Sequence, residues 1–100
     1  MNVAAEMRLI LIEAAEPRGP QETIRAAILR ASRVLGLRYA RARALWYGDA
    51  RVRVRAEEAD ALRVARRALA AQRIARLQAK LAEEQALLDG LNRKIGGMNW

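Results

Sequence analysis

The chain has 100 residues and a formal net charge of +8, with 19 basic and 11 acidic side chains. This length allows one domain, with room for a helical extension. The absence of Cys and His excludes a disulfide framework, thiolate metal sites and the commonest general base. We therefore expect no catalytic residue, no metal site, no cofactor and no small-molecule substrate, and we expect that the chain is not an enzyme.

The composition predicts an all-α fold. Ala and Arg are the two commonest residue types, and both are good helix formers. No uninterrupted apolar stretch is long enough to span a bilayer, so no membrane-spanning helix is expected. The N-terminus lacks the cationic segment of a secretory signal. We expect a cytoplasmic, nucleoid-associated protein of bacterial or phage type.

An N-terminal helix is expected over residues 1–16. Val3, Met7, Ile10 and Ala14 recur at helical spacing, and Leu9, Leu11 and Ile12 widen that apolar face. The run 9–12 alone would also suit a strand, but the flanking Ala and Glu favour a helix. Two Pro and one Gly within residues 17–20 then interrupt the helix.

Residues 20–69 are expected to form the main domain. A helix is predicted to have Pro20, Gln21 and Glu22 in its first turn and to end at Gly36. A second helix is predicted from near Arg38 to about residue 46 or 47. Residues 51–55 then alternate Arg and Val, which is the period of a strand. This segment is expected to be a short wing or simply extended chain.

A long helix is expected over residues 56–95, because residues 56–89 contain no Gly or Pro. Its start should pack on the preceding part through Leu62, Ala65 and Leu69. The distal portion, residues 70–95, carries a heptad stripe with Glu84 as its one misfit: Ile74, Leu77, Leu81, Leu88, Leu91 and Ile95. We expect these residues to form a homodimer interface as a coiled coil, parallel or antiparallel, and residues 96–100 to form a flexible tail after Gly96 and Gly97.

The positive charge is concentrated in one part of the chain. Residues 21–56 hold nine Arg against Glu22 and Asp49, which is a net charge of +7. Codon bias alone would spread Arg evenly along the sequence. A polyanionic partner is the simplest physical reason for such a cluster.

The same part of the chain carries an ordered pattern of apolar positions. Gly36 is the ninth residue of the segment 28–47, where a sharp turn between two helices suits a glycine, and small Ser32 stands where the helices come closest. The positions that should face inward are all apolar: Ile28, Ala31, Leu35, Leu37, Ala42 and Leu45. This segment resembles the helix-turn-helix family of DNA-binding proteins. It departs from the pattern at Arg38-Tyr39, where a Ser or Thr cap would be preferred.

The order of segments extends the resemblance. A short basic ribbon at 51–55 followed by the acidic helix start at 57–60 looks like the wing and next helix of MerR-like and excisionase-like winged helices. In MerR-like regulators a long dimerisation helix comes next, as residues 70–95 would supply. The small size and basicity are similar to those of regulators carried by prophages. The additional N-terminal helix, the short wing and the lack of an effector domain depart from that pattern.

The resemblance implies roles for nine residues. Arg38, Tyr39, Arg41 and Arg43 should project from the recognition helix, with Arg41 and Arg43 contacting guanine and Tyr39 a phosphate or a thymine methyl. Arg30 and Arg33 on the first helix should contact phosphates. Arg51, Arg53 and Arg55 should follow a phosphate line or enter the minor groove. Trp46 is expected to pack this helix against residues 62–69, with base stacking as the alternative.

The sequence therefore predicts a sequence-specific, dimeric regulator of transcription that reads the major groove of double-stranded DNA with residues 38–47. An excisionase-like architectural or recombination factor that bends DNA stays open as an alternative. So does a helical protein–protein interaction module with a basic patch.

Overall fold

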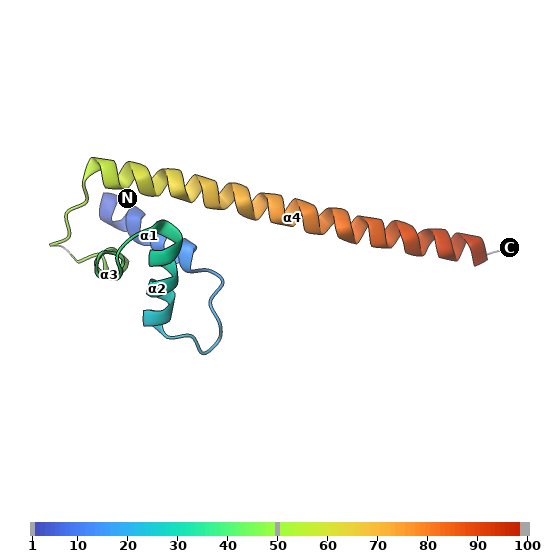
Figure 1. Cartoon of the computed structure of the whole chain (residues 1–100), viewed down its shortest axis with the longest axis horizontal. Helices are drawn as coiled ribbons and strands as arrows, with labels where there is room; N and C mark the ends of the chain where they lie inside the picture. Colours follow the sequence, from blue (N-terminus) through green and yellow to red (C-terminus); the bar gives the residue numbers. More distant parts are fainter. Residues whose placement is uncertain (1, 50, 99–100) are drawn as a thin grey trace. The chain divides into compact units, whose positions relative to one another are not determined.

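The computed structural model describes residues 2–49 and 51–98 and is helical (Figure 1). Its elements are α1 (Val3–Ala15), α2 (Ile24–Leu35), α3 (Tyr39–Tyr47) and α4 (Ala56–Met98). No strand occurs among the described residues, so the all-α prediction is confirmed. The contacts divide the chain into two compact units, Met1–Leu69 and Ala70–Trp100.

Helix α1 supplies more buried side chains to the core of the first unit than any other helix. Asn2 caps it, because its side chain accepts a hydrogen bond from the Ala5 amide at 2.8 Å. Its buried side chains are Met7, Ile10, Leu11, Ala14 and Ala15. Val3 and Leu9, which the spacing had also placed on the apolar face, are exposed. Both α2 and α3 contact α1 and each other, so α1 is an integral part of this unit.

The prediction for the start of α2 was wrong. Residues 20 and 21 form a turn, and the helix begins only at Ile24. The reason is local, since the Thr23 hydroxyl accepts a hydrogen bond from the Ala26 amide at 3.1 Å and so caps the helix there. Glu22 lies outside the helix, where its carboxylate accepts a hydrogen bond from the Gly19 amide.

The connection from α2 to α3 is a sharp turn at Gly36. This glycine has a left-handed conformation, with φ of 69°, and the Leu37 amide donates to the Ser32 carbonyl at 2.8 Å. Ser32 is buried, and its hydroxyl donates to the Leu29 carbonyl, so this buried polar group has a partner. The six positions of the apolar pattern are buried or half-buried: Ile28, Ala31, Leu35, Leu37, Ala42 and Leu45.

The beginning of α4 belongs to the first unit. Ala59 and Leu62 are buried with the core, and Leu69 packs partly against it. Two bidentate ion pairs join this part of α4 to α1, Arg63 with Glu6 and Arg66 with Glu13. Trp46 is buried in the same cluster as Leu62.

The prediction that the helix ends at Gly96 was wrong. Helix α4 continues through Gly96 and Gly97 to Met98, and the remaining residues of the expected tail, 99 and 100, lie outside the described residues. One glycine costs a helix only about 1 kcal/mol relative to Ala, so a long helix continues through two of them when nothing else competes for the backbone.

We predict that Gly36→Ala destabilises the first unit by about 1–2 kcal/mol, because a Cβ disfavours the left-handed conformation. No atom lies within 4 Å of the added Cβ, so the cost is purely conformational. Gly36→Asn is the matched control and should cost clearly less, since Asn tolerates this conformation. Thermal unfolding followed by circular dichroism measures both. Equal destabilisation by the two variants would contradict this account of the turn.

Candidate nucleic-acid interface

Helix α3 has one buried side and one exposed side. Ala42, Leu45 and Trp46 are buried in the core. On the opposite side Ala40, Arg43 and Tyr47 are exposed, with Ala44 half-buried between them. These four positions follow the i, i+3, i+4, i+7 spacing of a single helix face. We call them the α3 face.

A contact from α1 fixes the end of α3. The Arg8 Nε donates to the Trp46 carbonyl at 2.8 Å, which satisfies one of the last carbonyls of the helix. At the other end Arg38 is the N-cap residue and makes no capping hydrogen bond with its side chain. The sequence has no Ser or Thr to cap this helix, and the structure accordingly shows no side-chain cap at its start.

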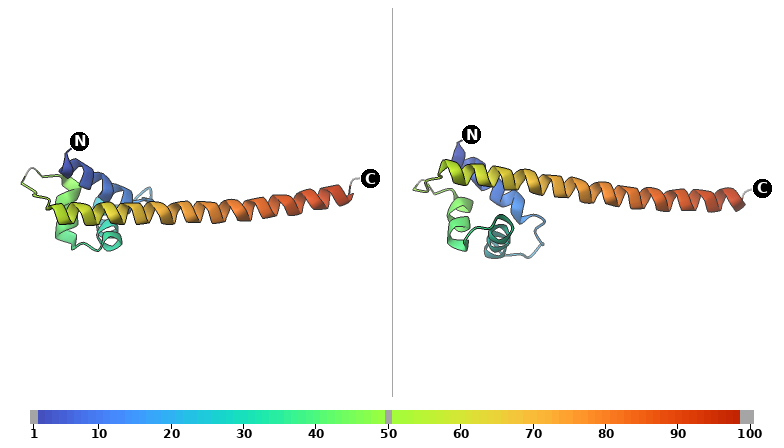
Figure 2. Two further views of the ribbon diagram at one scale, coloured as in Figure 1. Left: turned by 90° about the horizontal axis from the view of Figure 1, so that it is seen from above. Right: turned by 45° about the horizontal axis from the view of Figure 1, so that its top comes forward.

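The segment after α3 presents a row of guanidinium groups. Residues 51–55, which we call the extended segment after the pattern in the sequence, form neither a helix nor a strand with described residues (Figure 2). Val52 and Val54 pack partly against the core, whereas Arg51, Arg53 and Arg55 are exposed. The alternation in the sequence therefore separates an anchored side from a cationic side. Of the two predicted forms, a wing built from a strand is not observed in this segment.

Arg41 joins three segments of the first unit. Its guanidinium makes a bidentate ion pair with Glu58 on α4, at 2.8 Å for Nε and 2.5 Å for Nη2. The same Nη2 donates to the Arg53 carbonyl at 2.7 Å. The hydrogen bonds from Arg41 hold the pKa of Glu58 below its usual range, and Glu58 in turn raises the pKa of Arg41. We call this arrangement the Arg41 clasp.

An open groove lies between α3, the extended segment and the start of α4. Its lining is mixed in charge but mainly basic: Ala40, Arg41, Arg43, Ala44, Tyr47, Asp49, Arg51, Val52, Arg53, Arg55, Glu57 and Glu58. Arg41 and Glu58 neutralise each other there. Arg43 lies over the Tyr47 ring, 5.5 Å from its centroid. The groove therefore combines exposed cations with an aromatic side chain.

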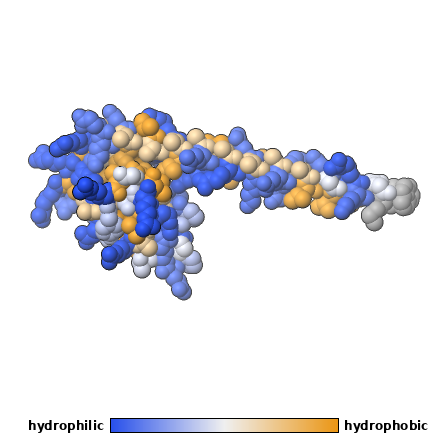
Figure 3. Space-filling model, viewed as in Figure 1, coloured by the Kyte–Doolittle hydropathy of each residue, from blue (hydrophilic) through white to orange (hydrophobic). Residues whose placement is uncertain are grey.

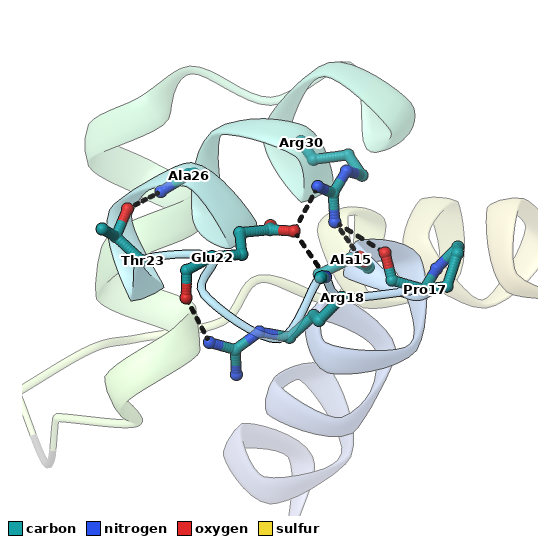
Figure 4. A network of polar contacts seen from close by, with 8 residues as sticks. Ala15, Pro17, Arg18, Glu22, Thr23, Ala26 and Arg30 are labelled. Carbon is teal, nitrogen blue, oxygen red and sulfur yellow. Dashed lines mark hydrogen bonds and ion pairs between the residues drawn. The ribbon is translucent and has the colours of Figure 1, made fainter.

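Arg30 takes a structural position instead of an outward one. It forms an ion pair with Glu22 at 2.6 Å and donates to the Ala15 and Pro17 carbonyls, so it ties α2 to the loop after α1 (Figure 4). Arg18 donates to the Glu22 carbonyl from the other side of the loop. The Ala15 and Pro17 carbonyls and the Glu22 carboxylate thus hold a guanidinium that is still partly exposed.

The other predicted contact residues fall into two groups. Arg33, Arg38 and Arg43 are exposed, like the three Arg of the extended segment. Tyr39 is half-buried against the core, and Arg25 lies 5.9 Å from its ring centroid. Sequence reasoning missed Tyr47 as an exposed member of the α3 face. Its i+4 spacing from Arg43 was the available signal.

In the second unit, the predicted interface residues all lie on the surface of α4. Their exposed fractions run from 50% to 67%, and Leu87 is exposed to a similar degree: Ile74, Leu77, Leu81, Leu88, Leu91 and Ile95. Figure 3 shows hydrophobic side chains reaching the surface along this distal part of the helix. This apolar stripe is large enough to require an explanation.

Neither a metal site nor a membrane span is seen in the part of the chain that the structure describes. No three acidic side chains in residues 2–49 and 51–98 are grouped so as to hold a metal ion. No helix there is both long and apolar enough to cross a bilayer. Comparison of the chain with protein-family models, with curated proteins and with solved structures found no match.

We predict that breaking the Arg41 clasp destabilises the first unit. Arg41→Ala and Glu58→Gln should each lower the free energy of unfolding by about 1–3 kcal/mol, because each leaves a charged hydrogen-bonding partner without its counterpart. A double-mutant cycle on chemical denaturation measures the coupling between the two residues. Additive effects of the two substitutions would show that the ion pair contributes nothing.

We also predict that stability falls in acid. Hydrogen bonds from Arg63, Arg30 and Arg41 lower the pKa values of Glu6, Glu22 and Glu58, respectively. A lowered folded-state pKa contributes stability that is present above the ordinary Glu pKa of about 4.3 and is lost as the pH falls through the folded value.

The midpoint of thermal unfolding should therefore change little between pH 7 and pH 5 and drop steeply between pH 4 and pH 2. Glu58→Gln provides the comparison, since it removes one of the three groups and should reduce the drop. A midpoint that does not change with pH over this range would refute the contribution of these ion pairs.

Proposed function

We propose that the chain binds double-stranded DNA. The observation that carries this proposal is the exposure of seven of the nine Arg in residues 21–56 around the α2–α3 helix pair. Their charge is largely uncompensated, because the nearby Glu22 and Glu58 are already paired with Arg30 and Arg41. Dense cationic surfaces of this kind attract phosphate backbones and release their counterions.

The α3 face is the surface proposed to enter the major groove. Ala40 and Ala44 have small side chains, so the helix backbone can approach the base edges closely. Arg43 is long enough for a bidentate contact to guanine, and it now stands as the main candidate for base readout because Arg41 is held in its clasp. Arg38, at the start of the helix, is exposed beside it.

The extended segment is proposed to follow a neighbouring phosphate line. Val52 and Val54 anchor it to the core, which leaves Arg51, Arg53 and Arg55 on the outer side. A preformed row of guanidinium groups loses less conformational freedom on binding than a mobile arm would. Phosphate contacts of this type position a protein on DNA without reading its sequence.

We further propose that the protein acts as a homodimer through the apolar stripe of α4 and regulates transcription. One recognition helix covers only a few base pairs, and a symmetric dimer doubles the readout on a palindromic site. The architectural alternative requires DNA bending with little base discrimination. The protein-interaction alternative requires an acidic protein surface in place of the duplex.

A gel-shift titration at several salt concentrations tests DNA binding. We expect the logarithm of the affinity to fall linearly with the logarithm of the salt concentration, with about 0.9 added to the slope for each phosphate neutralised. Arg53→Ala should weaken binding to all duplexes and reduce that slope. Arg67→Ala, which removes an exposed Arg on α4, is the matched control and should change little. Absence of binding to any duplex at low salt would refute the proposal.

Base readout is tested with the α3 face. Arg43→Ala should cost about 1–3 kcal/mol on the preferred duplex and relax the choice of sequence, which selection from a random duplex pool reveals. If Arg43→Ala and Arg53→Ala weaken all sequences alike, the architectural alternative replaces the regulator. A selected palindrome would support a dimer on DNA.

Dimerisation is tested by sedimentation or light scattering on the full chain. Leu81→Glu should shift the protein from dimer to monomer, because it places a charge in the apolar stripe. Ala79→Glu adds the same charge on the opposite face of the same helix and should leave the dimer intact. A wild-type chain that stays monomeric at tens of micromolar would exclude the homodimer.

A further inference from the structure

The apolar stripe of α4 has an acidic residue at its centre. Along the heptad positions from residue 74 to residue 95 the side chains are Ile, Leu, Leu, Glu84, Leu, Leu and Ile. The six apolar members are half or more exposed, and Glu84 is exposed with them. The order is the same from either end, so a second copy of the chain can cover the stripe in either direction. The direction then depends on where each arrangement places Glu84.

A parallel pair places the two Glu84 side chains in the same layer. Layers of a parallel coiled coil join identical positions, so the carboxylates face each other between apolar neighbours. At a separation of about 6 Å and an effective dielectric constant of about 20, two like charges repel strongly enough to weaken the dimer roughly a hundredfold. Neither flank offers a compensating charge from the other chain, because the facing positions are Gln78 and Gln85.

An antiparallel pair gives each Glu84 an opposite charge. With Leu81 of each copy opposite Glu84 of the other, Leu77 meets Leu88 and Ile74 meets Leu91 of the second copy. Heptad position d lies toward the same flank as position g, and the g flanks of antiparallel helices face each other. Lys80 stands at position g, one residue before Leu81. Because Leu81 lies opposite Glu84 of the second copy, Lys80 comes beside that carboxylate on the g flank. The two-fold symmetry makes this contact twice.

The charges also select one register. A shift by one heptad in one direction brings Lys80 beside Lys94 of the second copy, and a shift in the other direction brings the two Lys80 side chains together. The preferred register has one unfavourable contact of its own, Arg73 beside Lys94 of the second copy at each end. These flanking groups remain in contact with solvent, where like-charge pairs cost only a few tenths of a kcal/mol. The repulsion within the closed layer of the parallel pair is several times larger.

We infer that residues 70–95 pair antiparallel with the same segment of a second copy, in the register that places Glu84 of each chain beside Lys80 of the other. This inference rests on the homodimer proposed above and is independent of DNA binding. It makes Glu84 and Lys80 the residues that determine direction and register. The apolar side chains supply the area that the pair buries.

Distances between labels attached to the full chain test the direction. The chain has no Cys, so Gln72→Cys and Ala86→Cys each provide a single labelling site, both exposed and on the side of α4 away from the stripe. In the antiparallel register the two labels at residue 86 are offset along the axis by about 10 Å, and those at residue 72 by about 32 Å. Pulsed electron paramagnetic resonance should therefore give a clearly longer distance for residue 72 than for residue 86. Equal distances at the two sites would overturn the inference in favour of a parallel pair.

Charge reversal tests the register. Lys80→Glu should raise the dimer dissociation constant roughly tenfold, since it turns two attractive contacts into repulsive ones. The double variant Lys80→Glu/Glu84→Lys restores opposite charges and should recover most of that loss. A Lys80→Glu variant that dimerises as well as the wild type, or a double variant that shows no recovery, would refute the contact. A wild-type chain without dimers would refute this inference and the homodimer together, while the gel-shift result for DNA would be unaffected.

Discussion

The buried face of α1 is the surface on which the first unit depends. Met7, Ile10 and Leu11 are its large buried residues, and α2 and α3 both pack against them. The chain has no Phe and many Ala, so its core must be formed by helices that approach closely instead of by large side chains. Buried Ala27, Ala31 and Ala42 on the other helices provide that closeness. The orientation of α3, and therefore of its exposed face, follows from this packing.

The arginines serve two purposes, and their partners distinguish them. Arg30 and Arg41 hold loop and helix segments together through carboxylates and backbone carbonyls, and Arg63 and Arg66 join α4 to α1 through bidentate pairs. The Arg of the extended segment are exposed. A guanidinium already held by a carboxylate must lose that pair before it contacts a base or phosphate. The exposed group is therefore the one on which the proposed DNA binding rests.

The sequence was sufficient for the elements of the fold and insufficient for the partners of individual side chains. Helical spacing identified the helices, and the preference for glycine at a sharp turn between helices identified the turn at Gly36. Both signals are local in the chain. The partner of Arg41 is 17 residues away on another helix, and the carbonyls that Arg30 reaches lie 13 and 15 residues away. Such contacts depend on how the helices pack, which periodicity does not encode. The start of α2 was missed for a different reason, since the Thr23 cap outweighed the preference of Pro20 for a first turn.

In the antiparallel pair proposed above, Glu84 gives up stability for specificity. A seventh apolar residue at this position would bury more area and strengthen any pairing of the stripe. The stripe would then be compatible with parallel and antiparallel partners alike, because its order is the same in both directions. A charge at the centre weakens every arrangement of the two helices. It weakens the parallel one most, because there the two carboxylates share a layer and no lysine of the other chain faces them. Polar groups in coiled-coil cores fix direction and register in this way. In the proposed pair, the one residue that departs from the heptad pattern thus carries the information about direction that the apolar residues lack.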